Sequence, residues 1–184
     1  MEVSRDGILF HARREGLALG AYQDGKHMSI GFGSNDPDLR QGDTITVSDA
    51  FRGLVQNIRD REKILNKMLK VDVKQHQYDA LASLLYQAGV DDLKPVVDLV
   101  NAGKIEDAAK EFLEHDVNAK GEHLPGLLAR RFREANLFYT GEYGDINPIP
   151  YWRGNPRAAG VKQERYHVTE KDLPMEGINE WLKA

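Results

Sequence analysis

The chain has 184 residues, with 25 Lys and Arg against 29 Asp and Glu, and its formal net charge is −4. This length suits one domain or two small lobes, and the mild acidity argues against nucleic-acid binding, which usually needs a basic surface. The absence of cysteine excludes disulfides and thiolate chemistry and argues against a structural zinc. No apolar run approaches the roughly 20 residues of a membrane helix, and the first residues do not resemble a secretory signal. We therefore expect neither a membrane nor a nucleic acid as a partner.

The first 33 residues predict a helix followed by a β-hairpin. Residues 4–15 share an apolar face, with Ser4 as the expected cap and Gly16 as the expected end. Asp24 and Gly25 form a dipeptide that favours a turn between two extended runs. In the second run apolar residues alternate with small ones, so Ser29 is predicted to point away from the apolar side. Residues 34–46 are predicted to be loop or weak strand.

After this hairpin the pattern becomes helical. A long amphipathic helix is predicted from about residue 48, with Ser48 as its cap. The next helix, around Tyr78 to Leu85 and ended by Gly89, is apolar on most sides and is expected to be central. Pro95 is predicted to open a short helix. Two further helices follow, the last with an apolar face that is expected to comprise four residues, Leu128, Phe132, Ala135 and Tyr139.

The predicted fold is therefore α+β and mostly helical, with a small N-terminal hairpin lobe and a larger helical lobe. Residues 144–184 differ from the rest because they contain five of the seven prolines and both tryptophans. About 40 residues rarely fold alone without staples. This segment is expected to pack on the main body or to dock on a partner.

Two carboxylates are the candidates for chemistry. Glu15 lies at the predicted end of the first helix and Asp24 at the predicted hairpin turn. Two carboxylates that face one cleft can divide the acid and base roles of glycoside hydrolysis. On spacing alone, the alternative is a surface glutamate paired with Arg13 or Arg14 and an aspartate that only forms a turn.

Four motifs, in order, then give a more specific indication. Arg14 to Asp24, with its Glu-Gly pair and Tyr22, is followed by Ser29-Ile30-Gly31-Phe32-Gly33. Further along come Gln77 to Leu81 with Tyr86 to Val90, Asn101 to Phe112, and Leu124 to Gly141 with its arginine pair. This arrangement resembles that of the phage-type lysozymes.

The resemblance implies a lysozyme-like fold over residues 1–143, a catalytic domain, with a proline-rich extension over 144–184. It implies cleavage of the β-1,4 bond between N-acetylmuramic acid and N-acetylglucosamine in peptidoglycan glycan strands. Glu15 matches the general acid, Asp24 the second carboxylate, and Ser29 the threonine that holds the attacking water.

In the same resemblance Tyr86 and Gln87 line the sugar cleft. An arginine, Arg130 or the less favoured Arg131, reaches Glu15. No cofactor is implied, and the six histidines form no metal-binding pattern.

There are departures from the family pattern. The interval from Asp24 to Ser29 is one residue shorter than usual, and Ser34 stands where many members have histidine. Residues 144–184 match no part of the family. We expect them to attach the enzyme to a phage tail or virion protein, the alternative being an extension that packs on the body and adds stability.

Two classes of function stay open at this point. The first is an active muramidase in phage lysis or wall penetration, kept in the host cytoplasm until a holin releases it or carried on the virion. The second is a lysozyme-fold structural or ejection component of a virion with weak or no activity.

Overall fold

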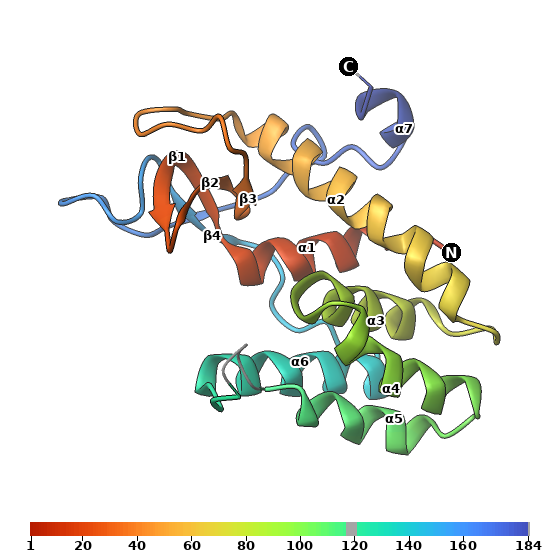
Figure 1. The fold of residues 1–184 in the computed structure, drawn as a ribbon. Coiled ribbons are helices and arrows are strands. Elements are labelled where there is room, and N and C mark those ends of the chain that lie inside the picture. The colour runs from red at the N-terminus through yellow and green to blue at the C-terminus, as the bar shows by residue number, and fades with distance from the viewer. Residues whose placement is uncertain (117–120, 184) are drawn as a thin grey trace. The chain divides into compact units, whose positions relative to one another are not determined.

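The computed structural model describes residues 1–116 and 121–183 (Figure 1). They group into two compact units. The helical unit comprises Met1–Gly7 and Ile58–Gly144, and the sheet unit comprises Ile8–Asn57 and Asp145–Ala184. Residues 145–184 thus group with the N-terminal hairpin and not with the helices that precede them.

The chain contains seven α-helices and one 3₁₀ helix in the described residues, and five strands. In chain order they are α1 (Arg5–Glu15), β1 (Leu17–Asp24), β2 (His27–Gly31), β3 (Ser34–Asn35), α2 (Val47–Met68), α3 (Gln75–Ala88), α4 (Val90–Asn101), α5 (Ile105–Glu111), η1 (Phe112–Glu114), α6 (Pro125–Thr140), β4 (Ile149–Trp152), β5 (Glu164–Tyr166) and α7 (Ile178–Trp181). The α+β, mostly helical class predicted from the sequence is confirmed.

The first helix has the ends that its sequence predicts. The Ser4 hydroxyl accepts a hydrogen bond from the Gly7 amide at 3.0 Å, which is the usual N-terminal cap. At the other end Gly16 has φ +71°, and its amide donates to the Ala12 carbonyl at 3.0 Å. Because this backbone conformation favours glycine, the sequence turns directly from α1 into β1.

The sheet has the strand order β3-β2-β1-β4-β5. β1 pairs antiparallel with β2 and parallel with β4, so that Leu17 lies opposite Tyr151 and Ala18 opposite Trp152. β5 pairs antiparallel with β4, and β3 with β2. Two of the five strands therefore come from the proline-rich C-terminal segment, which the sequence had set apart from the hairpin.

The helical unit is built around α3, as predicted. Nine consecutive residues of this helix, 77–85, are buried. Among them, the Asp79 carboxylate accepts hydrogen bonds from the Ser4 amide at 3.1 Å, the Gln75 side chain at 2.8 Å and the Tyr143 hydroxyl at 2.6 Å. Asp79 thereby joins the N-terminus and the end of the helical unit to the central helix.

Three details of the helical prediction are wrong. The cap of α2 is Thr46 and not Ser48, because the Thr46 hydroxyl accepts the Asp49 amide at 3.1 Å and donates to the Asp49 carboxylate at 2.7 Å. The helix around Pro95 begins at Val90, five residues before the proline. The hydrogen bond that Pro95 does not make would end on the carbonyl of Asp91, an exposed residue, so solvent compensates for its loss.

The third error concerns the buried face of α6. Phe132 and Tyr139 were expected to face the core, yet each is 55% exposed. The inward positions are occupied by Arg131, Glu134, Leu137 and Phe138. A buried ion pair at positions i and i+3 stands where apolar periodicity alone would place hydrophobic side chains, and the stripe drawn from apolar residues is therefore rotated.

Candidate active site

Glu15 and Asp24 both belong to the sheet unit. Glu15 is the last residue of α1, and its side chain is half-buried at the junction with β1. Asp24 is the last residue of β1, lies opposite His27 across a two-residue turn, and has a side chain that is 55% exposed. The two carboxylates thus come from the two ends of β1 and have different solvent exposure.

Tyr22 lies within electrostatic reach of both carboxylates. Burial raises the pKa of the Tyr22 phenol, and the negative charges of Asp24 and Glu15 raise it further, while Arg157 lowers it. Tyr22 pairs with Ser29 in the hairpin, and Asp24 pairs with His27, so the side chains of all four share one face of the β1–β2 ribbon. The sequence motif included Tyr22 but gave it no role.

Ser29 is on this face and is only 1% exposed. Its hydroxyl donates a hydrogen bond of 2.6 Å to the side-chain oxygen of Asn35, the residue opposite it in β3. The hydroxyl hydrogen is therefore engaged, and the oxygen lone pairs are what Ser29 offers to a water molecule. Asn35 was not predicted as a site residue, because residues 34–46 were expected to be loop or weak strand.

The three predicted substrate-contacting residues belong to the helical unit. The Arg61 guanidinium lies over the Tyr86 ring, 4.8 Å from its centre. The Gln87 side-chain oxygen accepts a hydrogen bond of 2.8 Å from Arg131. Arg130 donates to Glu134 at 3.1 Å. The expected contact of Arg130 with Glu15 concerns residues of different units and stays a prediction.

Arg131 and Glu134 form a fully buried ion pair beneath this surface. The Arg131 Nε lies 2.9 Å from one Glu134 oxygen, and the Ser83 hydroxyl donates to the other at 2.6 Å. Burial lowers the pKa of Arg131, the charge of Glu134 opposes this, and Arg130 adds to the lowering. Two guanidinium groups thus depend on one carboxylate, and one of them orients Gln87.

We expect Glu134→Gln to destabilise the helical unit by about 3–5 kcal/mol, because it leaves two buried or half-buried guanidinium groups without a counter-charge. The measurement is urea unfolding followed by circular dichroism. The matched control is Asp98→Asn, which breaks the exposed Lys94–Asp98 pair and should change the free energy of unfolding by less than about 1 kcal/mol. Equal effects of the two substitutions would contradict this account of the buried pair.

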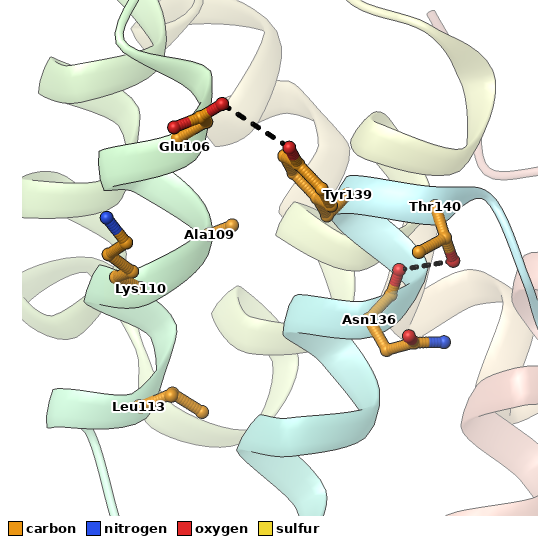
Figure 2. Close-up of a pocket in the computed structure, with 7 residues that line it drawn as sticks. All are labelled: Glu106, Ala109, Lys110, Leu113, Asn136, Tyr139 and Thr140. Carbon is orange, nitrogen blue, oxygen red and sulfur yellow. Dashed lines mark hydrogen bonds between the residues drawn. The ribbon is translucent and has the colours of Figure 1, made fainter.

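A pocket of about 320 Å³ lies between α5 and α6 (Figure 2). Its lining residues are Glu106, Ala109, Lys110, Leu113, Asn136, Tyr139 and Thr140. The Tyr139 hydroxyl donates to the Glu106 carboxylate at 3.4 Å, across the opening. None of the predicted site residues lines it, so this pocket is not the predicted sugar site.

Two further features were searched for in residues 1–116 and 121–183. In this part of the chain no three His, Asp or Glu side chains are grouped so as to bind a metal ion. Within the same residues, no helix combines the length and the apolar character that crossing a membrane requires.

An α+β fold with a helical unit around one central helix, and a small sheet unit bearing two carboxylates, is the lysozyme-like fold, and similar solved structures bear this out. One is an endolysin from Escherichia coli O157:H7 phage FAHEc1, with a TM-score of 0.74 and 29% identity over 79% of this chain and 98% of that one. Another is the muramidase domain of SpmX from Asticaccaulis excentricus, with a TM-score of 0.68 and 28% identity over 76% of this chain and 98% of that one.

The chain belongs to the phage lysozyme family, whose model matches residues 12–134. Among its relatives, the endolysin of Bacillus phage B103 is 34% identical over 152 residues, which is 80% of this chain but only 57% of that protein. The endolysin of Salmonella phage P22 is 31% identical over 147 residues, which is 76% of this chain and 99% of that protein. The family match includes Glu15, Asp24, Ser29, Tyr86, Gln87 and Arg130.

Proposed function

We propose that this protein is a muramidase that cleaves the β-1,4 bond between N-acetylmuramic acid and N-acetylglucosamine in peptidoglycan, during phage lysis or wall penetration. The observation that carries the proposal is the arrangement of Glu15 and Asp24 around Tyr22, whose phenol is influenced by the charges of both. Membership of the phage lysozyme family supports the same substrate class.

In the proposed mechanism Glu15 protonates the leaving glycosidic oxygen. Asp24 accepts a proton from a water molecule on the opposite face of the sugar, and the Ser29 oxygen helps to orient that water. An attack from the opposite face inverts the anomeric carbon, which requires the two carboxyl groups to lie roughly 6.5–9.5 Å apart. Tyr86, Gln87 and Arg130 are proposed to contact the glycan, and Arg131 would hold the Gln87 amide in place.

The test is the digestion of purified peptidoglycan followed by borohydride reduction of the new reducing ends. A muramidase gives reduced muramic acid, whereas a glucosaminidase gives reduced glucosamine. The absence of any new reducing end would favour the other candidate, a lysozyme-fold structural or ejection component of a virion. Attachment to such an assembly through residues 144–184 would then be tested by co-purification with virions.

Asp24→Asn should lower the rate of hydrolysis by about 10²–10⁴, which is the usual contribution of a general base. Ser29→Ala should cost less, because Asp24 still orients the water. Proton NMR of the first product formed should show the α-anomer. Appearance of the β-anomer first would exclude direct attack by water and assign Asp24 a different role.

A further inference from the structure

The C-terminal segment makes a close approach to β1 at Gly20. A Cβ atom at this position would lie 2.6 Å from the backbone nitrogen of Asn155 and 2.7 Å from the carbonyl carbon of Gly154. Real Cβ atoms do not approach backbone so closely, so this contact requires glycine at position 20. The turn that follows Gly154 is thereby placed against the strand that ends at Asp24.

This turn has a defined conformation. The Asn155 side chain accepts a hydrogen bond of 2.8 Å from the Arg157 amide, and the Asn155 carbonyl accepts one of 3.1 Å from the Ala158 amide. An asparagine that bonds to the backbone two residues on is a common device for fixing a turn. Arg157 therefore projects from an ordered turn and not from an unstructured loop.

The Arg157 side chain contacts the candidate site. Its Nη2 donates a hydrogen bond of 2.9 Å to Oδ1 of Asp24, and its guanidinium carbon lies 5.4 Å from the centre of the Tyr22 ring. Across residues 1–116 and 121–183, no other side chain donates a hydrogen bond to the Asp24 carboxylate. Because Asp24 ends its strand at an exposed turn, its own hairpin does little to fix the orientation of this carboxylate.

We propose that Arg157 is a positioning residue for Asp24, an inference that rests on the proposed muramidase function. The guanidinium holds Oδ1 and leaves Oδ2 available to the attacking water. Tyr22 supports the guanidinium from one side through a cation–π contact. The C-terminal segment, which has no counterpart in the recognised family motifs, thus contributes a side chain to the active site.

The expected effect is modest, because both partners are more than half exposed and such pairs contribute up to about 1 kcal/mol. Arg157→Ala should lower kcat about fivefold on soluble peptidoglycan fragments, which corresponds to about 1 kcal/mol, and change KM less than twofold. Arg157→Lys should recover part of the loss, since an ammonium group donates one hydrogen bond but not in the planar geometry of a guanidinium.

The matched control is Arg153→Ala. Arg153 is an exposed arginine of the same segment that pairs with Glu164 at 3.0 Å and has no contact with Asp24. Removing it makes the same change in net charge, so any general effect on binding to an anionic wall appears in both variants. Melting temperatures of all variants should agree within a few degrees, which separates positioning from folding.

Three outcomes would overturn the proposal. They are an unchanged kcat in Arg157→Ala, an equal loss in Arg153→Ala, and a gain in kcat, which would make the contact inhibitory. In the Asp24→Asn background, Arg157→Ala should have no further effect on kcat. If Glu15→Gln and Asp24→Asn are both fully active, the proposed function itself is wrong. If both are inactive while Arg157→Ala behaves like Arg153→Ala, only the positioning role is lost.

Discussion

Glu15→Gln is expected to abolish wall hydrolysis, with a fall in rate of about 10³ or more, while the fold is retained. Glutamine has the size of glutamate but cannot transfer a proton to the leaving oxygen, and general acid catalysis contributes about 10²–10⁴. Glu15 ends its helix at a half-buried position, so the substitution leaves the helix and its glycine end intact. The measurement is the release of reducing ends from purified peptidoglycan, together with the melting temperature.

The control for this experiment is Glu176→Gln, an exposed residue of the same unit whose substitution makes the same change in charge. It should retain the rate of the unmodified protein. If Glu15→Gln also retains that rate, Glu15 is not the general acid, and the assignment based on the family motif fails.

Removal of residues 144–184 is expected to prevent the cooperative folding of the sheet unit. The truncation deletes β4 and β5 and exposes the edge of β1. It also removes buried apolar side chains, namely Ile149, Tyr151, Val168, Leu173 and Ile178. At about 1.5–3 kcal/mol for each large buried side chain, the loss is comparable with the whole stability of a typical domain, about 5–15 kcal/mol.

Scanning calorimetry of residues 1–143 measures this effect, and a chain that ends at Leu182 is the control for shortening alone. We expect the longer form to melt as the full chain does, and the shorter form to lose the transition of the sheet unit. A stable, active 1–143 chain would instead favour the expectation that the extension serves only to attach the enzyme to a virion.

Local patterns explain how much of the fold was predictable. The first helix and the hairpin follow from residues close in sequence, namely Ser4, Gly16 and the Asp24-Gly25 turn. The central position of α3 follows from its apolar character on most sides. The face of α6 did not follow, because Arg131 and Glu134 neutralise each other only when α3 supplies Ser83 and Gln87.

The candidate site divides in the same way. Glu15, Asp24 and Ser29 lie within 15 residues of one another, and their motif is visible in the sequence. Arg157 is 133 residues from Asp24, and no periodicity or spacing links the two. A resemblance to a family likewise cannot predict a contact that comes from a segment outside the family motifs.

The parallel pairing of β1 with β4 has a consequence for biosynthesis. Leu17 meets Tyr151, so β1 leaves the ribosome more than 130 residues before its partner strand. At about 5–20 residues per second, that interval is roughly 7–26 s. Throughout it one edge of β1 has unpaired backbone groups, the kind of surface on which chains aggregate. The helical unit is fully synthesised at Gly144 and can form within this interval, so the nascent chain passes through a state with completed helices and an open sheet.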